Sequence, residues 1–411
     1  MKSWKTSFTA LLIAETFAIM GFSISSPVIP LFLEEDIGIS DPVKLKMWVG
    51  LINSCASITM ALFAPIWGHL ADIFSRRAML LRALFGGALM ISLMTFAVSP
   101  WQLLVLKSIQ GCLTGTVAAA TVLTAGIAPA AQVAFVLGIL QTGIAVGNSL
   151  GPLVGGLVSD FLGHRAAFFS TGVVLAIAGV IVLKWVDEGA KPPKEAIQKK
   201  ISLIPNFKPI ISSPLLMTIM LLTLSVHTAS SVAYPMLPLF IKDLALGHNG
   251  EPSFIASTTG MVLGIGAAFT ALAAVLVGKI STRLGYWTTL ILCLSAGAML
   301  TAPQSLVTNV FQLTVLRAMA SFFMGGCIPV INAIIAVSSE KELQGTIYGF
   351  NSSMGSAGAA MGPLLGSATA MLSYRALFVV AALILAFSAL GAVTRRRKMG
   401  EISPGKSTTP P

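Results

Sequence analysis

The feature that most limits how this chain can fold is its hydropathy pattern, in which long apolar runs follow one another almost from end to end. Each run is close to the roughly 20 residues that an α-helix needs to cross a bilayer. Only 10% of the residues are charged, against roughly 25% in soluble domains. The pattern predicts an all-α integral membrane protein with twelve transmembrane helices. The predicted spans are 7–33, 47–67, 78–98, 102–126, 133–158, 166–186, 214–240, 253–277, 286–303, 310–336, 345–370 and 375–394.

The stretch between the sixth and seventh runs has a different composition. It contains "DEGAKPPKEAIQKK", which is charged and interrupted by proline, and it is typical of a soluble linker. We therefore expect an N-terminal six-helix half at 1–186, a cytoplasmic linker at 187–213, a C-terminal six-helix half at 214–394 and a basic, disordered tail at 395–411.

The two halves repeat each other. "SPVIPLF" at 26–32 returns as "YPMLPLF" at 234–240, and "GPLVG" at 151–155 returns as "GPLLG" at 362–366. An offset near 210 also places Lys107 opposite Arg317. Two equal, pseudo-symmetric halves of six spans predict a transporter that rocks around a substrate site near the bilayer midplane.

Lysine and arginine predict the orientation of the chain. If the N-terminus is cytoplasmic, 19 of the 26 basic residues fall on the cytoplasmic side, five fall outside and two lie within spans. Both termini are then cytoplasmic. The same bias accounts for the net charge of +11, with membrane phospholipid rather than nucleic acid as the counter-charge.

Several kinds of chemistry are excluded by missing motifs. There is no G-x-x-x-x-G-K-[ST] loop for ATP, no H-E-x-x-H motif and no cysteine–histidine cluster. The four cysteines lie far apart inside apolar runs, without disulfide or metal spacing. We expect no enzyme activity, no cofactor and no metal.

The loop between spans 2 and 3 reads "GHLADIFSRR". It resembles the G-x-L-a-D-[RK]-x-G-[RK]-[RK] motif of the major facilitator superfamily, with isoleucine for one basic residue and serine for the second glycine. A carboxylate here can accept hydrogen bonds at the N-terminus of a neighbouring helix. The resemblance implies a conformational latch made of Gly68, Asp72, Arg76 and Arg77. A loop that only sets the topology is the alternative.

Span 5 contains glycines at every fourth position followed by proline. One helix face is therefore free of side chains, which lets a second helix approach, and the proline bends the helix. The ending G-x-x-x-G-P-x-x-G-G resembles the motif of the twelve-span drug:proton antiporters, a family that includes bacterial multidrug exporters. The predicted motif residues are Gly143, Gly147, Gly151, Pro152, Gly155 and Gly156.

Span 4 reads "LLVLKSIQG", which resembles the l-x-x-x-R-x-x-q-G motif of the same family. Lys107 stands where arginine is usual, and Gln110 matches. The resemblance implies a part in proton coupling, and lysine, unlike arginine, can itself gain and lose a proton in a buried site. A lysine whose side chain reaches the membrane surface is the alternative.

Glu15 is the only one of 15 acidic residues deep in a span. A charge there costs at least about 2.5 kcal/mol, so such an acid is a functional candidate by default. On the family analogy, Glu15 and Lys107 face one aqueous cavity, where burial and the ammonium group oppose each other in their effect on proton binding. A proton and a cationic drug would then compete for Glu15. A structural acid paired to another helix is the alternative.

Three further polar residues are candidates for the substrate cavity: Gln141, His227 and Arg317. These features together favour a proton-coupled multidrug exporter that confers antibiotic resistance, with protons, small molecules and lipid as its partners. The resemblance implies a monomer in the bacterial inner membrane. A carrier for a defined metabolite (a sugar, an organic anion or a siderophore) remains the second reading, since Lys107 and Arg317 suit an anionic group.

Overall fold

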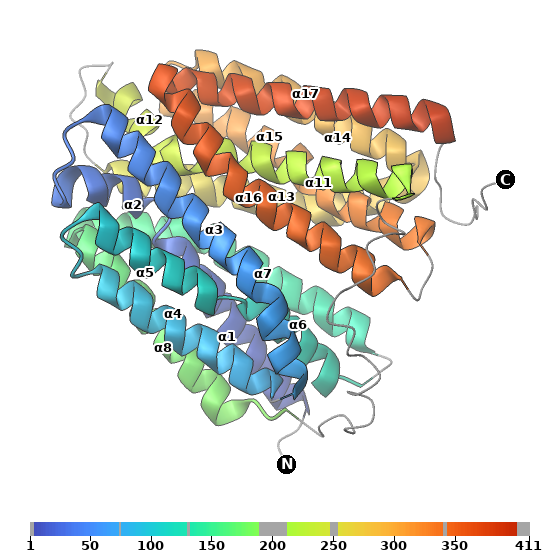
Figure 1. Cartoon of the computed structure of the whole chain (residues 1–411), viewed down its shortest axis with the longest axis horizontal. Helices are drawn as coiled ribbons and strands as arrows, with labels where there is room; N and C mark the ends of the chain where they lie inside the picture. The colour runs from blue at the N-terminus through green and yellow to red at the C-terminus, as the bar shows by residue number, and fades with distance from the viewer. Residues whose placement is uncertain are drawn as a thin grey trace. The chain divides into compact units, whose positions relative to one another are not determined.

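The computed structural model describes residues 4–73, 75–129, 132–188, 212–246, 254–339 and 343–400, and every regular element in them is a helix (Figure 1). The elements are α1 (Trp4–Ile24), α2 (Val28–Leu31), η1 (Phe32–Asp36), α3 (Pro42–Ile73), α4 (Arg76–Met94), α5 (Pro100–Leu113), α6 (Thr116–Ile127), α7 (Val133–Leu162), α8 (His164–Trp185), α11 (Pro214–Val232), η3 (Tyr234–Met236), α12 (Leu237–Leu246), α13 (Ile255–Leu284), α14 (Tyr286–Thr301), η4 (Ala302–Leu306), α15 (Val310–Ser338), α16 (Gln344–Leu372) and α17 (Tyr374–Met399).

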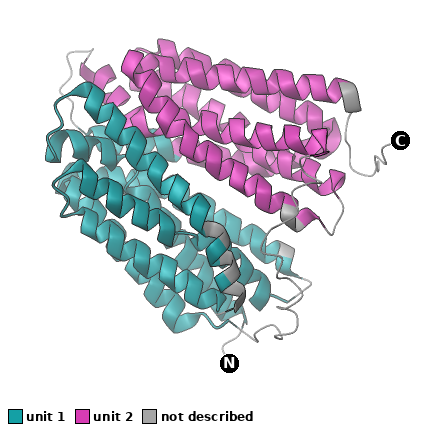
Figure 2. Ribbon diagram, in the orientation of Figure 1, with its two compact units in different colours: residues 1–203, 252–264 teal, residues 204–251, 265–411 magenta. Residues whose placement is uncertain are grey.

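The chain divides into two compact units (Figure 2). Unit 1 comprises Met1–Leu203 and Pro252–Gly264, and unit 2 comprises Ile204–Glu251 and Ile265–Pro411. Unit 1 thus contains the first six predicted spans together with the beginning of α13, whereas the rest of α13 belongs to unit 2. The predicted linker lies outside the described residues beyond Glu188 and before Ser212.

Eleven of the described helical segments are long and apolar enough to cross a membrane. The remaining predicted span, at 345–370, coincides with α16, a helix of 29 residues. Its length suffices to cross, but serines, glycines and Asn351 make it less apolar than the others. The protein is therefore a multi-pass, all-helical membrane protein in which α16 is a comparatively polar span.

Unit 1 is a bundle in which α1 packs against α7 and α8, α4 against α8, and α3 against α5. Local sequence signals set the helix starts. Ser75 caps α4 by accepting from the Ala78 N–H, and Ser99 caps α5, which then begins with Pro100. Fully buried Leu11 and Phe168 lie in the core of the unit.

Unit 2 repeats this arrangement. α11 packs against α16 as α1 does against α7, and α14 packs against α15 and α17. The rings of Phe240 and Phe378, with centroids 5.2 Å apart, and the buried side chain of Trp287 contribute to its core. The repeat in the sequence is therefore a repeat in the packing.

Two elements begin or end at residues other than those predicted. The fourth span, predicted as one helix at 102–126, is broken into α5 and α6, because Gly115 has φ 127° and cannot continue an α-helix. The last helix continues to Met399, so 395–399, predicted as the start of a disordered tail, are helical. Residues 401–411 lie outside the described part of the chain.

Candidate functional site

Glu15 lies in the middle of α1 with only 1% of its surface exposed. Neither of its carboxyl oxygens has a hydrogen-bond partner of regular geometry among the described residues. The carboxyl group meets the side chain of Thr116, the first residue of α6, in a looser contact. Glu15 therefore points into unit 1, at the place where span 4 is broken. The ion pairs found between described residues do not include Glu15 or Lys107.

The break between α5 and α6 is held by two large side chains. The indole Nε1 of Trp67 donates to the Cys112 carbonyl at 2.6 Å. A guanidinium nitrogen of Arg82 lies 3.4 Å from the Thr114 carbonyl, and the guanidinium stacks 3.5 Å from the centroid of the Trp67 ring. Carbonyl groups that a continuous helix would pair internally are thus satisfied from α3 and α4. We call Trp67 and Arg82 the span-4 clamp.

Gln110 and Lys107 lie on α5, just before the break. Gln110 is buried and donates from Nε2 to the Thr114 hydroxyl at 2.8 Å, and that hydroxyl donates back to the Gln110 carbonyl at 2.7 Å. Its side-chain oxygen Oε1 has no partner among the described residues. Lys107 is half-buried. Gln110 therefore helps to stabilise the break, and Lys107 is the basic residue of span 4.

The predicted glycine face of span 5 lies against α1. A methyl group built on Gly143 would lie 2.6 Å from the Thr16 hydroxyl oxygen, one on Gly147 would lie 2.7 Å from the Thr16 carbonyl oxygen, and one on Gly155 would overlap the Ile24 carbonyl. Only a hydrogen atom fits at these positions. Absent side chains on α7 thus allow the main chains of α1 and α7 to touch.

The same two helices enclose a groove of ≈ 440 Å³ in unit 1. Its lining is apolar apart from two hydroxyl groups, and it consists of Leu12, Ile13, Thr16, Phe17, Ile139, Thr142, Gly143 and Val146. A groove of this size suits a small lipophilic molecule. Gln141 is exposed on α7, one residue before Thr142.

The counterpart residues of unit 2 have other partners. Thr223, which lies opposite Glu15 in the repeat, is buried and donates to the Asn351 side-chain oxygen at 2.7 Å, joining α11 to α16. The ring of His227 covers Gly355, where an added methyl group would lie 3.1 Å from Nε2. Arg317 is half-buried and interacts electrostatically with Tyr234.

The motif of the loop between α3 and α4 is described in part. Gly68 and Asp72 lie in α3, and the Asp72 side chain lies outside the described part of the structure. The Glu188 carboxylate accepts from the Arg76 main-chain N–H at 2.6 Å and from the Ser75 hydroxyl. Arg77 donates to the Leu183 carbonyl. The N-terminus of α4 is thereby tied to the end of α8.

Sequence reasoning missed three residues of this site: Trp67, Arg82 and Thr116. Trp67 and Arg82 lie next to the loop motif and read there as ordinary span-end residues. The run "LTGTVAAA" was a signal for the break and for Thr116, since a glycine between threonines is a candidate helix break, but the sequence did not point to Trp67 or Arg82.

Comparisons with known proteins identify the family and the fold of the chain. The model of the family "Major Facilitator Superfamily" matches residues 11–306 and 298–410. "Multidrug resistance protein MdtG" of Salmonella typhimurium (strain LT2) is 32% identical over 403 residues, which cover 96% of this chain and 97% of that protein. The protein of the same name from Enterobacter lignolyticus is 31% identical over 401 residues, with 97% and 94% covered. The crystal structure of a bacterial homologue of the human lysosomal transporter Spinster has a TM-score of 0.81 at 14% identity and covers 98% of this chain and 100% of its own.

Proposed function

The chain belongs to the major facilitator superfamily, and on this basis we propose that it is a proton-coupled exporter of small amphipathic or lipophilic compounds. It works by alternating access, through rocking of its two halves. It performs no covalent chemistry, and its ligands are protons and small molecules. It acts as a monomer in a bacterial inner membrane, with both termini in the cytoplasm and its apolar surface in lipid.

The observation that supports this most is the setting of Glu15. Its carboxyl group is buried and has no regular partner among the described residues. A buried polar group without a partner needs an explanation, and for an acid within a membrane span that explanation is by default a functional one. The carboxyl group also lies at the N-terminal end of the half-helix α6. Broken helices with ends of this kind form ligand sites in transporters.

Two states of Glu15 follow from this setting. When the carboxyl group is enclosed, a bound proton removes the cost of burying a negative charge. When a cationic group or water reaches it, the carboxylate form is stabilised, and the positive end of the α6 dipole adds to this. A proton and a cationic compound therefore compete for one group, and binding of one favours release of the other.

The other predicted site residues have supporting roles in this scheme. Lys107 on α5 is the half-buried cation of span 4, and a lysine in such a site can itself gain and lose a proton. Gln110 maintains the break in span 4, and the apolar groove between α1 and α7, with Gln141 at its edge, receives lipophilic parts of the substrate. His227 and Arg317 are the polar residues that unit 2 would offer. The residues Gly68, Asp72, Arg76 and Arg77 form the cytoplasmic latch.

The test is uptake of a fluorescent cationic dye into everted vesicles whose interior is acidified. We expect Glu15→Gln to abolish uptake driven by the proton gradient. Asp243→Asn, which removes an exposed carboxylate from α12, is the matched control and should leave uptake unchanged. Full gradient-driven uptake by Glu15→Gln would refute the mechanism.

The second candidate, a carrier for a defined anionic metabolite, is favoured by one observation. Lys107 and Arg317 are half-buried in spans, and the ion pairs of the described residues include neither. In that case Arg317→Gln should abolish transport of an anion but leave dye export intact. A narrow substrate profile that requires a carboxylate or phosphate would identify this function.

A further inference from the structure

The ten residues from Gly156 to Arg165, at the end of span 5, repeat the pattern of the loop after span 2. They read "GLVSDFLGHR", with the glycine, the aspartate and the final arginine at the same spacing as in "GHLADIFSRR". Asp160 corresponds to Asp72, and His164 corresponds to Arg76. The chain thus contains the pattern of the cytoplasmic latch a second time, 88 residues later.

The two copies lie at opposite ends of unit 1. Between them the chain crosses three times, through α4, α5 with α6, and α7. The contacts of the two copies agree with their placement at opposite ends. The first copy meets Glu188 at the end of α8, whereas the second meets Asp36 at the end of η1, through His164 Nδ1 at 2.8 Å.

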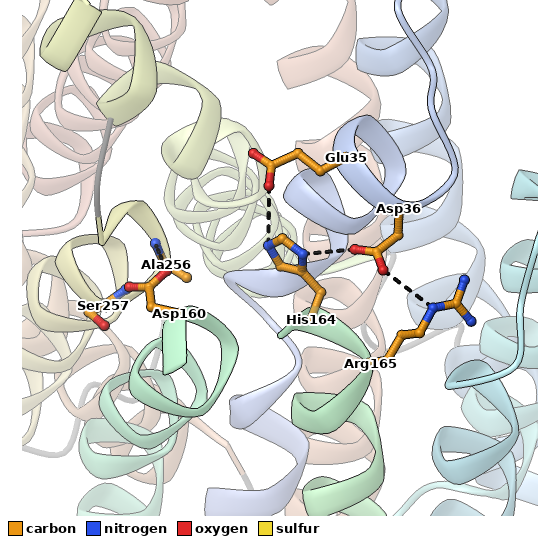
Figure 3. A network of polar contacts seen from close by, with 7 residues as sticks. All are labelled: Glu35, Asp36, Asp160, His164, Arg165, Ala256 and Ser257. Carbon is orange, nitrogen blue, oxygen red and sulfur yellow. Dashed lines mark hydrogen bonds and ion pairs between the residues drawn. The ribbon is translucent and has the colours of Figure 1, made fainter. Parts of the chain in front are cut away.

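The carboxylate of the second copy caps a helix. Asp160 accepts from the main-chain N–H of Ser257 at 2.7 Å and from that of Ala256 at 3.2 Å, at the first turn of α13 (Figure 3). These N–H groups have no partner inside their own helix, and the positive end of the helix dipole favours a negative charge there. The cap comes from α7, a different helix of unit 1.

Close packing continues this contact along α13. A methyl group on Gly156 would overlap the Ala256 carbonyl, and one on Gly260 would overlap the Pro152 carbonyl. The Ser149 hydroxyl donates to the Gly264 carbonyl at 2.8 Å. The antiporter glycines of α7 therefore serve two helices, α1 on one side and the beginning of α13 on the other.

The start of α13 is also under strain. Phe254, the residue before the helix, has φ 61°, and a bulky residue in this region is an outlier. Its ring lies 5.6 Å from that of Phe161, the neighbour of Asp160. A strained helix start is stable only while the surrounding contacts hold it, so loss of the cap would let it relax.

The end of α7 that carries Asp160 is held in place by the residues that follow it. His164 lies between the carboxylates of Asp36 and Glu35, at 2.8 and 3.9 Å (Figure 3). Arg165 pairs with Asp36 at 3.3 Å and donates to the Thr95 carbonyl at 2.6 Å. The carboxylate that caps α13 is thus immobilised in unit 1, while α13 itself leaves unit 1 after Gly264.

We propose that Asp160, together with the N–H groups of Ala256 and Ser257, is a second, releasable latch at the end of the protein opposite the cytoplasmic loop. In the state seen here it retains the first turns of α13 against α7. The inference rests on the proposed alternating access, in which this end must open. Opening breaks the two hydrogen bonds and releases the strain at Phe254.

The first test measures accessibility without substrate or proton gradient, so an error in the proposed substrate class does not affect it. In a background lacking the four native cysteines, Ser257→Cys reports on the latch, because the Ser257 hydroxyl is buried. A membrane-impermeant maleimide is added on the side where span 5 ends. Asp160→Ala should raise the labelling rate about tenfold, the effect of losing a helix cap.

The control is Asp41→Asn, which removes a carboxylate that caps α3 at the same end through the Val43 N–H. It should leave labelling unchanged. An unchanged rate in Asp160→Ala, or an equal rise in both variants, would overturn the proposal.

A second test does not depend on the folding of Asp160→Ala. The pair Asp160→Cys and Ser257→Cys is joined by a short bifunctional thiosulfonate reagent, and dye uptake is measured before and after reduction. Joining should stop transport, and reduction should restore it. Transport at the full rate by the joined protein would show that this contact need not open.

Discussion

Gly155 illustrates how one hydrogen atom sets the distance between two helices. A methyl group at this position would overlap the Ile24 carbonyl of α1, which is main chain and has no rotamer to change. We predict that Gly155→Ala lowers the free energy of unfolding by about 1–3 kcal/mol. The measurement is the thermal unfolding midpoint of the purified protein in detergent.

Gly138 is the matched control for this prediction. It lies in the same helix, with open space where a methyl group would be placed. Gly138→Ala should be neutral or should stabilise the protein by up to about 1 kcal/mol, because alanine is the better helix former. Equal effects of the two substitutions would show that the close approach of α1 is not what Gly155 provides.

Arg82 stabilises the break in span 4 through two interactions. Its guanidinium stacks on Trp67 and approaches the Thr114 carbonyl, a geometry that a lysine ammonium does not reproduce. We predict that Arg82→Lys lowers the unfolding midpoint by an amount equivalent to about 1–2 kcal/mol. Arg283→Lys, an exposed position in α13, should leave the midpoint unchanged, and a similar loss there would refute the assignment.

Single residues differ in how far the sequence could predict them. Glu15 and the span-5 glycines were visible because each is unusual within one helix: an acid in an apolar run, and glycine at regular intervals. The span-4 clamp was not visible. Trp67 and Arg82 act on another helix, 45 and 32 residues away in the chain, and one sequence contains no record of which helices touch.

Among the helices, span 4 departs most from regularity, and Gly115 is the reason. Its φ of 127° is a conformation that other residues rarely adopt. We predict that Gly115→Ala costs about 1–3 kcal/mol of stability and weakens gradient-driven uptake, since the start of α6 beside Glu15 moves. Thermal unfolding and dye uptake measure the two effects.

Gly391→Ala is the control for that substitution, because Gly391 lies in α17 with open space around it and no unusual φ. It should alter neither measurement. If Gly115→Ala unfolded at the normal midpoint and transported normally, the break would have no part in the coupling.

The helices as elements were largely predictable, and their interruptions were not. All twelve predicted spans overlap helices of the structure, because length and hydropathy report directly on the membrane. The break at Gly115 escaped notice because hydropathy measures composition and not main-chain hydrogen bonding. A glycine at this position of the repeat does not by itself predict a break. Gly325 lies opposite Gly115, yet the helix α15 continues through it.

In the whole molecule, the repeat places different chemistry at equivalent positions. Glu15 faces a broken helix, whereas Thr223 is bonded to Asn351 and the equivalent helix α15 is continuous. We predict that moving the acid, in the double variant Glu15→Gln with Thr223→Glu, does not restore gradient-driven uptake. Restored uptake would mean that either half can bind the proton.

The charge distribution over the chain predicts its topology. Alkaline phosphatase fused after Gly163 should be active, because the distribution of lysine and arginine predicts that this loop lies outside, and the same enzyme fused after Gly400 should be inactive. Fluorescent protein fusions should show the reverse pattern. Activity at both positions, or only after Gly400, would contradict the orientation inferred from lysine and arginine.

The side-chain-free contacts between α7 and its two neighbours also bear on electrical insulation. A membrane that stores a proton gradient loses it through any continuous file of water molecules, however thin. Where main chain touches main chain, as at Gly155 and Ile24 or at Gly156 and Ala256, there is no room for such a file. We therefore expect these glycine contacts to exclude water, and a bulky residue among them to make the membrane leak protons even when no substrate is present.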